Sequence, residues 1–179
     1  KLIVIKGRFN KPIDKIVWPE QIYYFDIEGL FDQPIDKVVW PPKILFVTIG
    51  GLFNQPIDTV MFPETVEALT FSSVFNQPIN KVVWPNSLLL LSFSGFPYFA
   101  NINNTGVFNQ PIDKVIWPPQ LRRVDFGAKF TKPLKSKWPR YMRYINVRGK
   151  QVNLYEQHFI ICHDLVDRFI FTVKHIVSH

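Results

Sequence analysis

The hydrophobic pattern of the chain repeats with a period of 22 residues, and each copy begins at a phenylalanine. Steps of 22, 22, 22, 33 and 22 residues separate the six copies, so the fourth step is one period plus an 11-residue insertion. The starting residues are Phe9, Phe31, Phe53, Phe75, Phe108 and Phe130. Self-similarity at a fixed period of this size predicts a solenoid in which each unit stacks on the next.

The second half of each copy has the alternation of a short β-strand. With the phenylalanine counted as position 1, positions 17 and 19 are apolar in every copy. Side chains two residues apart on a strand lie on the same face, so these positions face the core. One strand per copy, always entered in the same way, predicts a parallel sheet. With Ile3 and Ile5 as a leading half-copy, seven strands at about 4.8 Å spacing would form a stack roughly 30 Å long.

The first half of each copy is punctuated by two proline columns, at positions 4 and 11. These columns hold twelve of the fifteen prolines. Proline removes a backbone donor and clashes with a preceding helical turn, so two prolines seven residues apart exclude a regular helix between them. We therefore expect an outer arm that is extended or built of turns.

The repeat stops after residue 152, and a different period follows. Asn153 and Glu156 have the spacing of a capping box. Apolar residues then recur at steps of three and four, which predicts an amphipathic helix; they are Phe159, Cys162, Val166, Phe169, Val173 and Ile176. We expect a solenoid over residues 1–152, with the insertion near 96–107, and a C-terminal helical cap over 153–179 that covers the last repeat.

Composition and charge limit the classes of function that the chain can have. The apolar fraction of 47% argues against disorder, and the single Cys162 excludes an intrachain disulfide. No apolar run is long enough to span a bilayer, so we expect no membrane span. The net charge is +7, yet residues 120–151 alone hold ten Lys and Arg against Asp125. This segment predicts an acidic partner surface nearby or, as an alternative, a solvated face; weak nucleic-acid binding is the least favoured interpretation.

Other residue columns have structural explanations. Asn or Asp at position 2 is interpreted as turn chemistry that satisfies backbone groups between strands, rather than as a row of cation ligands. The tryptophans at position 10 are interpreted as core or as a stacked flank. The histidines near Cys162 match no zinc spacing, and the Asn103 glycosylation sequon is of a kind common by chance. No phosphate loop or catalytic spacing occurs, so we expect no enzymatic activity, no metal and no cofactor.

The strand positions that face away from the core differ from copy to copy, and they are the candidate partner-binding surface. Positions 16, 18 and 20 carry aromatic, polar and charged residues. The face that they form is apolar toward one end and basic toward the other. We expect them to be exposed and to bind a protein partner on the inner sheet face. The candidate residues are Tyr24, Asp26, Phe46, Leu90, Arg123, Tyr144 and Arg148.

The pattern FNQPI…WPPxLxxLxFG resembles the FNIP repeat, a 22-residue unit of the leucine-rich-repeat superfamily, over residues 1–151. A bacterial surface-protein repeat that contains FNQPL is a second, weaker resemblance. The FNIP resemblance implies a β-rich, right-handed solenoid with a parallel sheet on its inner face and a non-helical outer arm. It also implies an interaction module of amoebae or their large DNA viruses, often placed after an F-box, which favours an intracellular protein. The expected roles are substrate recognition in an F-box adaptor or, alternatively, a structural, surface or virion component.

Overall fold

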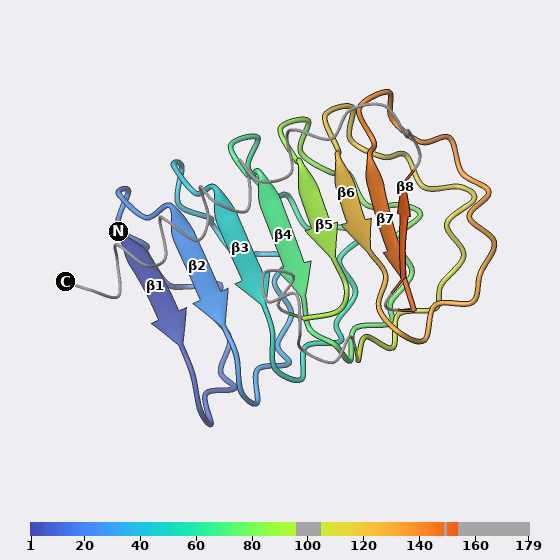
Figure 1. Cartoon of the computed structure of the whole chain (residues 1–179). Helices are drawn as coiled ribbons and strands as arrows, with labels where there is room; N and C mark the ends of the chain where they lie inside the picture. The colour runs from blue at the N-terminus through green and yellow to red at the C-terminus, as the bar shows by residue number, and fades with distance from the viewer. Residues whose placement is uncertain (96–104, 149, 154–179) are drawn as a thin grey trace.

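The computed structural model describes residues 1–95, 105–148 and 150–153. Within these ranges, eight strands form one sheet in sequence order, as Figure 1 shows. The strands are β1 (Leu2–Ile5), β2 (Tyr24–Ile27), β3 (Phe46–Ile49), β4 (Ala68–Phe71), β5 (Leu90–Ser92), β6 (Arg123–Asp125), β7 (Tyr144–Val147) and β8 (Lys150–Asn153). The predicted parallel sheet is confirmed for β1 to β7, each of which pairs in parallel with the next.

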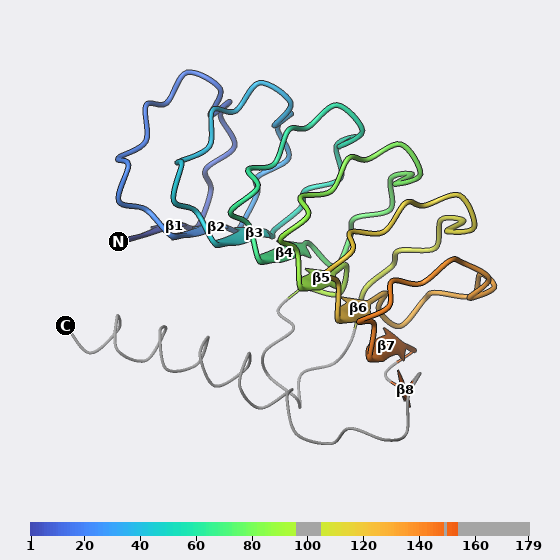
Figure 2. The same cartoon turned by 90° about the horizontal axis from the view of Figure 1, so that it is seen from above.

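The register of the sheet aligns equivalent positions of successive repeats. Tyr24 pairs with Phe46, and Phe46 pairs with Ala68, all at position 16. The insertion does not disturb this register, since Leu90 still pairs with Arg123 across the 33-residue step. In Figure 2 the strands follow the concave side of an arc, and the outer arms fan out along its convex side. The expected inner-face sheet is therefore confirmed.

The core is built from two stacked columns of phenylalanine. The rings at position 1 are buried from Phe31 to Phe130 and stack nearly parallel, and Phe53 lies 6.1 Å from both Phe31 and Phe75. A shorter second column, at position 19, consists of Phe71, Phe93 and Phe126 and interleaves with the first: Phe93 and Phe108 are 4.3 Å apart. Offset stacked rings add about 0.5–1.5 kcal/mol per pair beyond the area that they bury. Each repeat is therefore stabilised mainly by its two neighbours.

A ladder of side-chain amides joins the repeats next to the phenylalanine column. The Oδ1 atom of each position-2 residue accepts a hydrogen bond from the backbone N–H of the next position-2 residue. For example, Asn76 donates to Asn54 at 2.8 Å, and the Gln77 side chain donates to the Asn54 carbonyl oxygen at 2.8 Å. The same backbone bond recurs from Asn10 to Thr131. The structural interpretation of this column is confirmed, and the bonds run between repeats rather than within a turn.

The outer arm is built of turns, as the proline columns predict, and no helix occurs in the described ranges. The N–H at position 8 bonds the carbonyl at position 5, as from Val60 to Ile57, and the N–H at position 14 bonds the carbonyl of the second proline, as from Val66 to Pro63. Between these two turns, the tryptophan column is largely buried and partly stacked, with Trp40 and Phe62 6.0 Å apart. The prediction of a packed flank for the tryptophans is confirmed.

The chain turns around after β7, which the sequence did not predict. β8 runs antiparallel to β7, with Val147 opposite Lys150 and Tyr144 opposite Asn153. Asn153 is therefore the last residue of β8, one residue beyond the predicted end of the solenoid at 152. The backbone bonds of the hairpin occupy the edge of β7, and Arg148 adopts the positive φ of 53° that such a reversal needs. The rest of the predicted helix, over 154–179, lies outside the described residues.

Glycine is required where the turns after the strands stack on one another. Gly29 and Gly51 both have positive φ, at 79° and 64°. A Cβ atom at Gly51 would collide with the carbonyl oxygen of Gly29, and one at Gly29 would collide with that of Gly7. Backbone therefore lies directly on backbone at this corner, where a side chain has neither a favourable φ nor room.

Truncation of one core ring should unfold the solenoid readily. We expect Phe53→Ala to lower the free energy of unfolding by about 3–5 kcal/mol, because a fully buried aromatic leaves a cavity. Urea denaturation followed by far-UV circular dichroism measures this loss. An unfolding midpoint equal to that of the unaltered protein would show that the Phe column does not carry the core.

The amide ladder permits a test with a matched control. Asn54→Ala removes the acceptor of the Asn76 N–H, which should cost about 1–3 kcal/mol for an unsatisfied, partly buried donor. Asn54→Asp keeps that acceptor, as Asp32 does one repeat earlier, where its Oδ1 accepts from Asn54 at 2.8 Å. We expect the Asp variant to unfold close to the unaltered protein in the same urea titration. Equal losses in both variants would contradict this role for the Oδ1 atom.

Candidate functional site

The inner face of the sheet consists of three rows of side chains, because positions 16, 18 and 20 are each aligned by the parallel register. Position 16 forms a mostly apolar row, with Phe46, Ala68 and Leu90 at its centre. Position 18 forms a hydroxyl row through Thr48, Thr70 and Ser92, which ends in Asp26 on one side and Asp125 on the other. Position 20 is small or charged: Lys6, Glu28, Gly50, Ser72, Ser94, Gly127 and Arg148.

The predicted exposure of this face is wrong for several residues. Tyr24 and Leu90 each retain 8% of their exposure and Asp26 retains 3%. Phe46, Arg123 and Tyr144 are half-buried, and Arg148 is exposed. Sequence alternation gives the face on which a side chain lies but not how deeply it is buried.

The N-terminal end of the inner face is acidic. Lys6 and Glu28 form an ion pair at 3.3 Å. The pKa of Asp26 is raised from 3.8 to about 7, mainly by burial and also by the charge of Glu28, whereas Lys6 and the Tyr24 hydroxyl act to lower it. Burial also raises the pKa of Tyr24, with a contribution from the charge of Asp26. The Asp26 carboxyl therefore gains and loses its proton near neutral pH, where an ordinary aspartate is fully ionised.

The C-terminal end of the inner face is basic and more fully hydrogen-bonded. The Asp125 Oδ1 atom accepts from the Gly127 N–H at 3.0 Å, and its Oδ2 atom accepts from the Asn146 side chain at 3.1 Å. Arg148 Nε donates to the Phe130 carbonyl oxygen at 3.0 Å. Arg123 projects from β6, in the same row as Tyr144 on β7. The structure thus brings Arg123, Tyr144 and Arg148 together at one end and Tyr24, Asp26 and Phe46 at the other, with Leu90 between them.

Three buried polar atoms of the inner face have no hydrogen-bond partner among the described residues: Asp26 Oδ1, Arg123 Nε and Asn146 Oδ1. Two of them are acceptors and one is a donor. An unsatisfied buried polar group costs about 1–3 kcal/mol, so such groups usually mark a place where water or a bound group completes the bonding.

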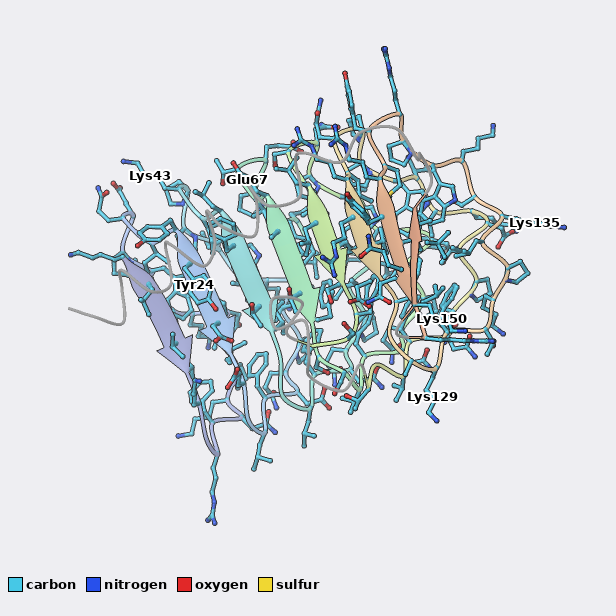
Figure 3. All side chains as sticks on the ribbon, viewed as in Figure 1. Tyr24, Lys43, Glu67, Lys129, Lys135 and Lys150 are labelled. Carbon is cyan, nitrogen blue, oxygen red and sulfur yellow. The ribbon has the colours of Figure 1, made fainter. Side chains whose placement is uncertain are left out.

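Three other cations of the basic segment lie apart from one another. In Figure 3, Lys129, Lys135 and Lys150 lie at separate places around the last repeats, with Lys135 at the outer arm. Arg123 lies on the inner face. These positions do not form a continuous basic groove of the kind that a nucleic-acid backbone would follow. Only the Arg123 and Arg148 part of the segment belongs to the candidate site.

Within the described ranges, no three His, Cys, Asp or Glu side chains gather in a way that would hold a metal ion. The same ranges contain no helix long and apolar enough to cross a membrane.

A feature that sequence reasoning missed lies on the outer arm. Position 9 is apolar in five copies, and these side chains are exposed rather than buried: Val17, Val39, Met61, Val83 and Ile116. The signal in the sequence was an apolar residue between two inward positions, 8 and 10, on an extended segment. Alternation should have placed it outward.

Comparison with known proteins agrees with this architecture. The family model described as FNIP Repeat matches residues 53–96. The solved structure of CroV588, described as a novel circular LRR protein, superimposes with a TM-score of 0.63 and 27% sequence identity. The match covers 79% of this chain and 19% of the CroV588 chain, so the present chain spans less than a quarter of the length of CroV588. No curated protein matches the sequence.

These comparisons and the geometry define a leucine-rich-repeat-like solenoid. The FNIP Repeat match falls on the copies that begin at Phe53 and Phe75.

The raised pKa of Asp26 makes a pH-dependent prediction. The folded state binds the Asp26 proton more tightly than the unfolded state does. The stability that this proton contributes is therefore complete below pH 3.8 and is lost as the pH rises through about 7. Asp26→Asn removes this loss. We expect the stability of the Asn variant relative to the unaltered protein to increase from pH 4 to pH 7 and then to stay constant.

Urea unfolding of both proteins at pH 4, 5, 6, 7 and 8 measures that difference. Asp36→Asn is the matched control, because Asp36 is exposed on the outer arm, and its difference from the unaltered protein should not change over the same range. A difference for Asp26→Asn that is independent of pH would show that this carboxyl titrates at its ordinary value.

Proposed function

We propose that the chain is a non-enzymatic protein-binding module that holds its partner on the inner sheet face. The observation that supports this most directly is the charge distribution of that face, with Asp26 and Glu28 toward one end and Arg123 and the exposed Arg148 toward the other. The half-buried Phe46 and Tyr144 supply the aromatic surface that interfaces favour.

The charge distribution indicates the polarity of that partner. Asp26 and Glu28 lie on or just after β2, whereas Arg123 and Arg148 lie on β6 and just after β7. Four strand spacings separate β2 from β6, which is about 19 Å along the sheet. The partner is therefore an elongated surface that is acidic where it meets Arg123 and basic where it meets Asp26.

The FNIP repeats favour a role as the substrate-recognition part of an F-box adaptor. Leucine-rich-repeat-like solenoids commonly act through such concave surfaces, because stacked repeats present a long row of side chains at fixed spacing. In this role the inner face selects the protein, and the remainder of the adaptor acts on it.

A second candidate function is that of a rigid structural body. The likeness to CroV588, a circular LRR protein of which this chain covers 19%, favours it, because a longer array of the same unit would close into a continuous wall. The stacked core makes each repeat rigid against its neighbours. A structural role would use the inner face little, which separates it from the first proposal.

Substitution on the inner face separates the two functions. We expect Arg123→Glu to reduce capture of a specific protein from a host lysate at least tenfold, because it reverses the charge that meets the acidic end of the partner. Phe46→Ala should reduce capture as well, through lost apolar contact. Immobilised protein and quantitative mass spectrometry of the bound fraction provide the measurement.

Lys37→Glu is the matched control, since Lys37 is exposed on the outer arm. Circular dichroism should show that all three variants remain folded. If Lys37→Glu removed the captured protein and both inner-face variants retained it, the partner site would lie on the outer arm. If no protein were captured specifically by the unaltered chain, the structural role would be favoured.

A further inference from the structure

The inner sheet face is covered more completely than the described strands and turns explain. Its short side chains are almost fully buried, with Thr70 2% exposed and Ser92 0% exposed. Neighbouring strands shield the flanks of such a side chain, but not the end that points away from the sheet. No described strand or turn lies across this face, which is the concave side of the arc in Figure 2. Something other than the described elements therefore covers it.

The burial extends across several strands rather than over one spot. Asp26 on β2, Ala68 on β4 and Asp125 on β6 are all buried. Four strand spacings separate β2 from β6, which is about 19 Å along the sheet. Val4, on the edge strand β1, is 41% exposed in the same row as Asp26. The cover is therefore elongated, and it crosses the strands.

The sequence after β8 has the length and the pattern that such a cover needs. Residues 154–179 lie outside the described residues, and their sequence predicts an amphipathic helix with apolar residues at steps of three and four. As a helix, these 26 residues would extend about 39 Å. The seven strand spacings from β8 back to β1 amount to about 34 Å. One helix could thus span the whole sheet.

The charges of this segment match those of the sheet in one direction only. Glu156 and Lys174 are 18 residues apart, which is five full helical turns, so they lie on one side of the predicted helix about 27 Å apart. Arg148 and Glu28 both occupy position 20, and five strand spacings, or about 24 Å, separate them. A helix that runs from β8 toward β1 brings opposite charges together at both ends. The reverse direction would bring like charges together.

We propose that residues 154–179 form an amphipathic helix that lies along the inner sheet face and covers the candidate partner site in cis. Its apolar stripe packs on the row of Phe46, Ala68 and Leu90. The helix then lies on the concave face of the sheet, not over the end of the last repeat. Because it occupies the candidate site, it competes with the partner, and this part of the inference rests on the proposed function. Such competition lowers the apparent affinity by the fraction of molecules whose face is open.

The single cysteine reports docking without any partner. Cys162 lies on the apolar stripe of the segment, and a thiol reacts with a maleimide dye only where the dye can reach it. We expect labelling of the folded chain to be at least tenfold slower than labelling of the same chain in concentrated urea. Val166→Asp with Phe169→Asp, on the same stripe, should remove most of this protection. Gln157→Asp with Ser178→Asp, on the opposite side of the predicted helix, is the matched control and should retain it.

A substitution in the sheet distinguishes the inner face from the end of the last repeat. Ala68→Glu places a long charged side chain at the centre of the inner face. Position 16 holds Arg123 in another copy, so the strand accepts a long side chain there. We expect this variant to label Cys162 at least tenfold faster than the unaltered chain. Lys37→Glu, on the outer arm, should leave the rate unchanged.

A charge exchange tests the direction of the helix. Lys174→Glu should accelerate labelling of Cys162 several-fold, because it brings a second carboxylate toward Glu28. Adding Glu28→Lys should slow the labelling again. Glu28→Lys is also measured alone, since it removes the ion pair with Lys6. A double variant that labels as fast as the faster single variant would overturn the proposed direction.

Three further outcomes would overturn the docking itself. Rapid labelling of the unaltered chain would show that the segment is not held. Slow labelling of a folded Ala68→Glu variant would place the segment away from the inner face, as a cap over the last repeat would be. A dimer in sedimentation equilibrium that is lost in the Val166 and Phe169 variant would assign the cover to a second copy of the chain.

Capture from a host lysate tests the competition separately. The Val166→Asp and Phe169→Asp variant should capture at least tenfold more of the specific protein than the unaltered chain, and adding Arg123→Glu should remove that gain. Equal capture despite a released Cys162 would contradict the competition. A protected Cys162 with no capture by any variant would contradict the proposed function and leave the docking in place.

Discussion

The structure depends on the stacking of identical side chains in register. A phenylalanine at position 1 has little to pack against within its own 22 residues, and it becomes buried only when the next ring lies about 6 Å away, as Phe53 does between Phe31 and Phe75. The asparagine ladder fixes the same register through backbone N–H groups that no other partner satisfies, such as that of Asn76. Any shift between repeats would break both interactions together, so the solenoid tolerates variation mainly where neither occurs.

That constraint explains where the chain is free to vary. The inner face changes from Asp26 through Thr48 and Thr70 to Asp125 along a single row, because no stacked ring or ladder amide occupies position 18. The same freedom produces a face that is acidic at one end and basic at the other. The row at position 9 of the outer arm shows the opposite behaviour, since it stays apolar without being buried. One surface is distinguished by its variation and the other by its uniformity.

Much of the fold followed from the repeat alone. The spacing of phenylalanines gave the number of turns, the two proline columns excluded helix from the outer arm, and alternation at positions 17 and 19 located the strands. β8 was missed because its four residues carry no repeat signal, and the capping-box spacing of Asn153 and Glu156 favoured a helix instead.

The sequence by itself determined the unit, its period and the direction in which each strand residue points, because these are properties of a chain with alternating side chains and fixed φ at proline. It identified the members of the inner face for the same reason. Only the tertiary structure decided how deeply those members are buried, as in the raised pKa of Asp26, since burial depends on residues that are far apart in the sequence. It also decided how far each side of the outer arm is covered: stacking of the repeats buries Val38, whereas Val39, which alternation already directs outward, remains 74% exposed.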